Sequence, residues 1–319
     1  MTQSWKITAY APRDQIEAAL VAHEDALVWD SAIVLSGREV AEDRPQDWVL
    51  EAWLTHKPRP ADKSAISGLF GPNPPPLETE RLPDADWVTL SQQGIDPIRS
   101  GRFHVRTPDH LACTEPGIRD FIIPASRAFG TGQHETTSGC LAMLGMMKAH
   151  GVIARNIADI GTGTGLLAFA ALSLWPRALA TASDIDPVCA EVVGHNATAN
   201  GMLMSARAGS VTMVVADGMS DPLLAARGPY DLLIANILAG PLVELAPDFA
   251  RAVVPGGHVL LSGLLETQEP LVRKAYRRAG FRLARHLVNG HWSVLWMRKR
   301  AVLPGRHSRI SQQPYWMRE

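Results

Sequence analysis

The chain has 319 residues, of which 46% are hydrophobic and 20% charged, and its formal net charge is −1. This composition is ordinary for soluble globular proteins, and the length predicts two domains. The first residues carry no apolar signal core, and no 18-residue apolar run follows, so we expect a cytoplasmic protein without a membrane partner.

The three cysteines, Cys113, Cys140 and Cys189, are dispersed and form no CxxC pair. This spacing argues against a zinc site or a disulfide scaffold and fits a reducing compartment. We therefore predict no metal.

Residues 1–90 have the pattern of a small α+β unit. Alternating residues 5–11 predict a strand, and Pro12 then opens a helical pattern as a first-turn proline. Further strands are predicted at 27–37 and 47–57, followed by a short helix and a last strand near LETERLP. This β-α-β-β-α-β order predicts a ferredoxin-like domain.

Residues 91–120 read as a linker with lead-in strands, and residues 121–300 alternate between strands and helices. Such alternation predicts a mostly parallel, Rossmann-like sheet covered on both faces. The last two strands flank Asn289-Gly290, a pair that favours a two-residue type I′ hairpin turn. We expect residues 301–319 to form a basic, disordered tail.

The stretch DIGTGTG (159–165, the glycine loop) follows a predicted strand and precedes a predicted helix. Gly161 and Gly163 allow a tight turn and close approach to a ligand. Asp184 ends the next strand, where a carboxylate can accept both ribose hydroxyls of a nucleoside. A nicotinamide-binding loop would need Gly or Ala where Leu166 stands, so the spacing favours S-adenosylmethionine, whose tail is an amino acid.

Two further positions are open to two interpretations each. Ile185 either packs on the adenine or belongs to the core. Asp217 either accepts the adenine amino group or begins a turn before Gly218.

Asn236 ends an otherwise apolar strand, YDLLIAN, and should point into the crevice at the carboxyl ends of the strands. Its side-chain carbonyl can accept a hydrogen bond from an amine and aim the amine lone pair at the sulfonium methyl. The alternative is an asparagine that satisfies local turn backbone.

FGTGQHETT, DIGTGTG, SDIDP, ANILAGPL and LLSGLLETQ occur in this order. Over residues 97–300 the chain closely resembles the bacterial ribosomal protein L11 methyltransferase family. The resemblance implies a class I S-adenosylmethionine-dependent enzyme that methylates lysine side chains and the amino terminus of L11. It also implies that residues 1–90 recognise the substrate. The cofactor contacts that it implies fall on Thr137, Gly161, Asp184 and Asn236.

The chain departs from the family pattern in three places. Gln133 and Glu135 flank the histidine where Thr and Pro are usual, and Thr162 replaces a common Cys. The tail beyond residue 300 is an addition.

The segment AFGTGQHETT (128–137) precedes the helix that leads into the sheet, so we predict a lid over the cofactor. Phe129, Gly130, Thr131 and His134 are its candidate residues, and deleting or stiffening it should reduce turnover. Thr136 or Thr137 is expected to cap the following helix.

Twelve Lys/Arg and one acid lie between Arg273 and the C-terminus. This imbalance is typical of either a solvated face or a surface that contacts ribosomal RNA. The leading hypothesis is a monomeric protein N-methyltransferase. The alternatives are a related enzyme acting on RNA or a small molecule, and a ribosome-assembly protein that binds S-adenosylmethionine without turnover. NILAG lacks the NPPY-type aromatic expected for a flipped base, which disfavours RNA.

Overall fold

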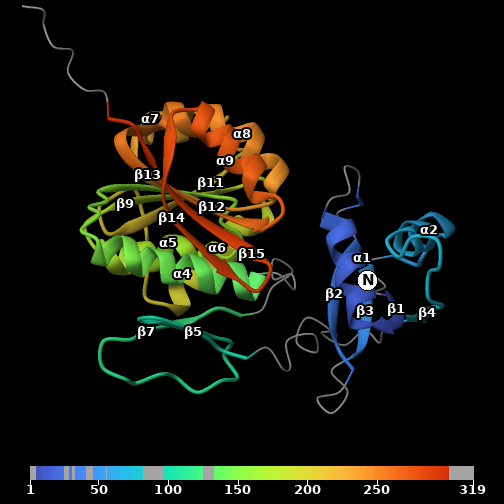
Figure 1. Cartoon of the computed structure of the whole chain (residues 1–319). Coiled ribbons are helices and arrows are strands. Elements are labelled where there is room, and N and C mark those ends of the chain that lie inside the picture. The colour runs from blue at the N-terminus through green and yellow to red at the C-terminus, as the bar shows by residue number, and fades with distance from the viewer. Residues whose placement is uncertain are drawn as a thin grey trace, which may run out of the picture.

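The computed structural model describes residues 5–24, 29–30, 33–40, 46–54, 56–81, 96–124 and 133–301. Figure 1 shows a small amino-terminal unit and a larger carboxy-terminal one. The small unit contains, in chain order, β1 (Trp5–Pro12), α1 (Arg13–Glu24), β2 (Ile33–Glu39), β3 (Asp47–Leu54), α2 (Pro60–Gly68) and β4 (Leu77–Arg81).

The four strands of the small unit form an antiparallel sheet in the order β2-β3-β1-β4. Alternate strand residues such as Ile7 and Leu50 are buried beneath Ile16 of α1 and Ile66 of α2. Connectivity and strand order confirm the predicted ferredoxin-like arrangement. Pro12 ends β1 instead of opening α1, and β2 begins later than predicted, at Ile33.

A three-stranded sheet leads into the larger unit and is anchored to it. Its strands are β5 (Ile98–Ser100), β6 (Phe103–Arg106) and β7 (Arg119–Ile122). Ser100 Oγ donates to the Ser138 carbonyl at 2.7 Å, and the Asn200 amide exchanges two hydrogen bonds with the Ile122 backbone, at 2.8 and 2.7 Å. Phe103 and Phe121 are fully buried, so these strands are part of the large core.

The large unit is built on an eight-stranded sheet whose order differs from chain order. That order is β10 (Leu203–Met204), β11 (Ser210–Val215), β9 (Leu179–Asp184), β8 (Asn156–Ile160), β12 (Tyr230–Asn236), β13 (Val253–Leu265), β15 (Trp292–Lys299) and β14 (Phe281–Asn289). All pairings from β10 to β13 are parallel, and β15 is antiparallel to both neighbours. This confirms the predicted mostly parallel sheet with an antiparallel carboxy-terminal hairpin.

Helices cover both faces of this sheet (Figure 1). One face carries α4 (Gln133–Ala149), α5 (Leu166–Leu174) and α6 (Val188–Ala199), and the other α7 (Pro222–Arg227), α8 (Ala239–Ala252) and α9 (Glu269–Arg278). Successive strand residues alternate between two cores; Leu232 belongs to one and Leu233 to the other. Burial on both faces explains why these strands read as continuous apolar runs.

The hairpin turn lies one residue later than predicted. Asn289 pairs with Trp292, which leaves Gly290 and His291 in the turn. Gly290 has a φ of 59°, and no non-glycine residue of the described chain has a positive φ. A type I′ turn needs positive φ at both central positions, so that prediction is wrong. Asn289 instead donates through Nδ2 to the Glu135 carbonyl at 2.9 Å and ties the hairpin to α4.

Candidate functional site

The candidate site lies where the order of strand addition in the sheet reverses. β8 and β12 are neighbours, but the chain runs from β8 to β9 on one side and returns to β12 on the other. Ligands of open α/β sheets bind at the carboxyl ends of the strands at such a switch point. Ile160 pairs with Ala235, so the glycine loop after β8 and Asn236 at the end of β12 lie side by side.

The glycine loop is held by the end of the neighbouring strand. The amide groups of Gly161 and Thr162 both donate to the Ser183 carbonyl, at 2.8 and 2.9 Å. Gly161 and Gly163 have φ values of 70° and 54°, which side chains rarely permit. The loop therefore keeps a fixed shape at the crevice.

Asp159, which we did not single out from the sequence, braces the loop from below. Its Oδ2 accepts hydrogen bonds from Thr162 Oγ1 at 2.6 Å and from the Ala168 amide at 3.0 Å. The carboxyl group is buried, and burial raises its pKa to about 6. An acid inside an apolar strand was the available signal, because such a group needs partners.

Asp184 is oriented by backbone donors on both oxygens. Oδ2 accepts from the Gly163 amide at 2.8 Å and Oδ1 from the Asp186 amide at 3.1 Å. Each carboxylate oxygen keeps capacity for another donor. The neighbouring Ile185 is 66% exposed, which removes the interpretation of Ile185 as a core residue.

Two other aspartates take part in local turns. Asp217 is exposed after β11, and its carbonyl accepts from Ser220 N and Oγ at 3.1 and 2.7 Å, so a turn begins there. Asp186 Oδ1 accepts from the Val188 amide at 2.9 Å at the start of α6. Asp217 keeps its side chain available, since the turn uses its backbone.

Asn236 has the most unusual polar environment of the predicted site residues. Its Oδ1 is buried, yet no described residue donates a hydrogen bond to it. Leaving a buried polar group unsatisfied costs about 1–3 kcal/mol. The observation disfavours the turn interpretation, because no described turn group satisfies this oxygen.

Thr137 is buried within α4. Because α4 begins at Gln133, Thr136 and Thr137 lie inside the helix, and the predicted helix cap is wrong. Of the predicted lid, Phe129, Gly130 and Thr131 lie outside the described residues. His134 belongs to the first turn of α4, and its side chain lies outside the description.

Sequence reasoning also missed packing residues around the site. Asn196 of α6 donates through Nδ2 to the Thr164 carbonyl at 2.9 Å and supports the glycine loop. Ile237 contacts Gly161, directly after β8, and Gly263, within β13. No local pattern marks such contacts.

Within the described ranges, no group of three or more His, Cys, Asp and Glu side chains is arranged to hold a metal ion. None of the helices in the same ranges has the length and apolar character needed to cross a membrane.

The sheet order, the antiparallel hairpin and the glycine loop beside Asn236 define the class I methyltransferase fold. The chain belongs to the ribosomal protein L11 methyltransferase (PrmA) family, whose model matches residues 14–300.

Similar proteins carry the same description. The chain is 40% identical over 220 residues to "Ribosomal protein L11 methyltransferase" of Rhizobium meliloti (strain 1021), covering 69% of this chain and 73% of the relative. It is 36% identical over 270 residues to the protein of that name from Agrobacterium fabrum, covering 84% and 89%. The crystal structure of ribosomal protein L11 methylase from Lactobacillus delbrueckii subsp. bulgaricus aligns with a TM-score of 0.53 at 27% identity, over 64% of this chain and 98% of that one.

Proposed function

We propose that this protein is a protein N-methyltransferase that transfers methyl groups from S-adenosylmethionine to ribosomal protein L11. The acceptors are lysine side chains and the amino terminus. The buried Oδ1 of Asn236 lies beside the glycine loop and receives no hydrogen bond from any described residue, and this observation carries the proposal. The printed names of the relatives support L11 as the substrate.

The residues present suit this cofactor. Asp184 keeps acceptor capacity for the ribose hydroxyls, Ile185 offers an exposed apolar face to the adenine, and Asp217 offers an exposed carboxylate to the adenine amino group. Gly161 and Gly163 permit close backbone approach to the amino-acid tail, and Thr137 completes the set of proposed contacts. When bound, S-adenosylmethionine supplies a methyl group already activated by the sulfonium.

Asn236 positions the acceptor. An amine that donates to Oδ1 satisfies the buried oxygen and directs its lone pair along a fixed line. Catalysis of such an in-line displacement is mostly orientation and removal of water. A lysine amine, with an ordinary pKa of about 10.4, loses its proton more easily in a desolvated pocket.

The decisive experiment incubates the protein with isotope-labelled S-adenosylmethionine and unmethylated ribosomal proteins and then locates the label by mass spectrometry. We expect label on L11 amines. Label on RNA or a small molecule would favour the related-enzyme alternative. Tight cofactor binding without transfer to any acceptor would favour the non-catalytic assembly protein.

We also propose that the ferredoxin-like domain recognises the substrate and that the protein acts as a cytoplasmic monomer.

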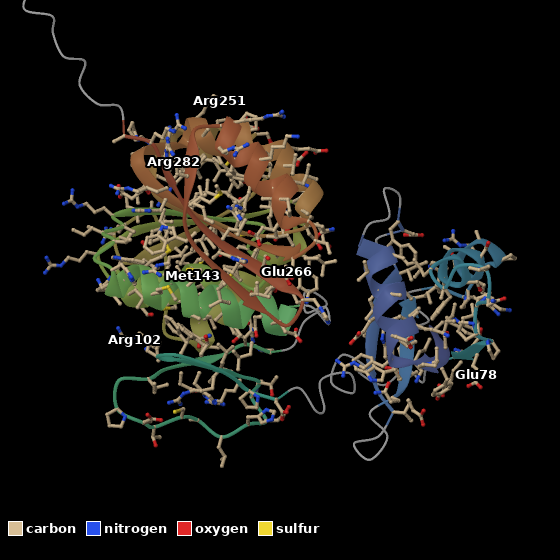
Figure 2. The ribbon with its side chains drawn as sticks, in the orientation of Figure 1. Glu78, Arg102, Met143, Arg251, Glu266 and Arg282 are labelled. Atoms are coloured by element: carbon tan, nitrogen blue, oxygen red, sulfur yellow. The ribbon has the colours of Figure 1, made fainter. Side chains whose placement is uncertain are left out.

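The basic surface on α9, β14 and β15 is proposed to contact ribosomal RNA. It comprises seven exposed cations within a stretch, 270–300, that contains no acid: Arg273, Lys274, Arg277, Arg278, Arg282, Arg298 and Arg300. Arg285, also exposed, instead donates to His150 Nε2 at 3.0 Å, next to the end of α4. Arg282 of β14, labelled in Figure 2, lies in that view on the same upper part of the unit as α9. Closely spaced cations that outnumber acids attract the phosphate backbone.

Replacing Lys274, Arg277, Arg278 and Arg282 with glutamine tests this contact. Fluorescence anisotropy with a labelled ribosomal RNA fragment should show weaker binding and a salt slope reduced by about 3, since each phosphate contact contributes about 0.7–0.9. A double variant of Arg177 and Arg207, exposed near the opposite end of the sheet, is the matched control for a double variant of Arg277 and Arg278. Equal affinities for both variants would refute the contact.

A further inference from the structure

We infer that Ile237 is a positioning residue for Asn236, wedged between Gly161 of the glycine loop and Gly263 within β13. The inference deepens the proposed function and rests on it. It begins from the absence of a hydrogen bond to Asn236 Oδ1 among the described residues. Because no described residue donates to this oxygen, the backbone on either side largely sets its direction.

On the amino-terminal side, the strand itself holds the chain. Ala235 pairs with Ile160 of β8, and Asn236 pairs with Ser262 of β13. On the carboxy-terminal side, the strand ends, and one backbone hydrogen bond, from Ile237 N to the Ser262 carbonyl at 3.2 Å, continues the connection. Additional packing at Ile237 is therefore needed to fix the peptide that follows Asn236.

That packing uses two glycines that contact different parts of Ile237. A Cβ added to Gly161 would lie 2.2 Å from Ile237 Cγ2, a side-chain atom. A Cβ added to Gly263 would lie 2.4 Å from the Ile237 carbonyl oxygen and 2.8 Å from its carbon, both backbone atoms. Cβ contacts below about 3 Å do not occur in folded proteins, so only glycine permits either approach.

Both glycines also have positive φ values, 70° at Gly161 and 82° at Gly263. An alanine at either position therefore has comparable backbone strain. The two alanine variants consequently serve as controls for each other, because they differ mainly in whether the added methyl group meets side chain or backbone.

The first test compares three substitutions at Ile237. Ile237→Val keeps the Cγ2 methyl group, whereas Ile237→Leu has the same size as isoleucine but lacks a methyl branch at Cβ. We expect Ile237→Val to keep kcat within about threefold of wild type. Ile237→Leu and Ile237→Ala should lower kcat by about 10- to 100-fold, as a displacement near 1 Å does. The Kd for S-adenosylmethionine, measured by calorimetry, should change by less than about threefold.

The second test uses double variants. Once Ile237→Ala removes Cγ2, the nearest remaining side-chain atom, Ile237 Cβ, is 3.7 Å from the added methyl at Gly161. If the two substitutions acted independently, their fold-losses in kcat would multiply. The double variant Gly161→Ala/Ile237→Ala should therefore lose at least about tenfold less kcat than the product of the two single losses. The losses of Gly263→Ala and Ile237→Ala should multiply, because that methyl still meets backbone. Melting temperatures of all variants check that each is folded.

Leu and Val variants with equal kcat, or multiplying losses for the Gly161 pair, would overturn the inference. An Ile237→Ala variant that loses cofactor affinity and keeps kcat would overturn it as well, since Ile237 would then serve binding alone. A wild-type protein that transfers no methyl group would instead overturn the proposed function. This outcome is distinguishable from failure of the Ile237 inference, because it is seen in the wild-type protein before any variant is compared.

Discussion

Two side chains at neighbouring strand ends have different environments and so different proposed roles. Asp184 has a backbone donor on each oxygen and is held in place before any ligand arrives. Asn236 has a buried oxygen without a donor among the described residues. A satisfied, oriented carboxylate suits recognition of a constant cofactor, whereas an unsatisfied oxygen suits an acceptor amine that enters in each turnover.

Alanine substitutions should separate these roles. Asn236→Ala should lower kcat by about 10²–10³, the usual effect of removing one polar group that acts on the reacting centre, with a smaller change in cofactor Kd. Asp184→Ala should mainly weaken cofactor binding, by about 10- to 100-fold, as expected for lost hydrogen bonds to a charged group. Kinetics and calorimetry on both variants measure the difference.

Glu191, exposed on α6, provides the control acid, and Glu191→Ala should change neither quantity. Full turnover by Asn236→Ala would contradict the positioning role of the amide.

At the level of elements, α4 connects the lead-in sheet, the central sheet and the hairpin. Ser100 binds the Ser138 carbonyl of α4, and Asn289 binds the Glu135 carbonyl. Gly139 allows the helix to approach β15 closely, because an added Cβ would lie 2.6 Å from Val294 Cγ2. The start of α4, which contains Thr137 and forms the second half of the predicted lid segment, is thereby held against the hairpin.

We expect Gly139→Ala to lower the free energy of unfolding by about 1–3 kcal/mol through overpacking. Gly145→Ala, in the same helix with nothing within 4 Å of the added methyl group, should instead raise it by about 0.5–1 kcal/mol. Urea unfolding of both variants measures the contrast. Adding Val294→Ala should recover part of the Gly139→Ala loss, and equal effects of the two glycine variants would refute the close approach.

At the level of the whole molecule, the two cores enclose ionisable groups that link stability to pH. Burial raises the pKa of Asp159 to about 6 from 3.8. The folded protein therefore holds this proton more tightly than the unfolded chain does. The corresponding contribution to stability is present below about pH 4 and is lost as the pH rises through about 6.

Asp159→Asn keeps an acceptor for Thr162 and Ala168 but removes the titration. As the pH rises from 4 to 7, the free energy of unfolding of this variant should increase relative to that of wild type. The increase should reach about 3 kcal/mol, at about 1.4 kcal/mol per pKa unit. Burial lowers the pKa of His258 to about 4, which gives a slope of opposite sign over much of this range. Both proteins contain His258, so the difference at each pH isolates Asp159. A constant difference from pH 4 to 7 would contradict the prediction.

The sequence by itself determined the alternation of strands and helices, the ferredoxin-like order of the small unit, and the positions of the glycine loop, Asp184 and Asn236. These features depend on local patterns: apolar periodicity, glycine spacing and a polar residue that ends an apolar strand. The same patterns did not predict the exact residues at which a helix or strand begins or ends. The hairpin turn consists of Gly290 and His291 instead of the predicted Asn289 and Gly290. Helix α4 begins before the two threonines that were expected to cap it.

Only the tertiary structure decided which groups lack partners and which residues press against one another. Asn236 Oδ1 receives no hydrogen bond from the described residues, and Asp159 is buried, because of what surrounds each of them in space. Ile237 meets Gly161 and Gly263 because parallel strands bring the ends of β8, β12 and β13 to one edge of the sheet. Contacts between residues so distant in the chain leave no periodic pattern in the sequence. The need for glycine at 161 and 263 is visible only once Ile237, from another part of the chain, is seen to pack against them.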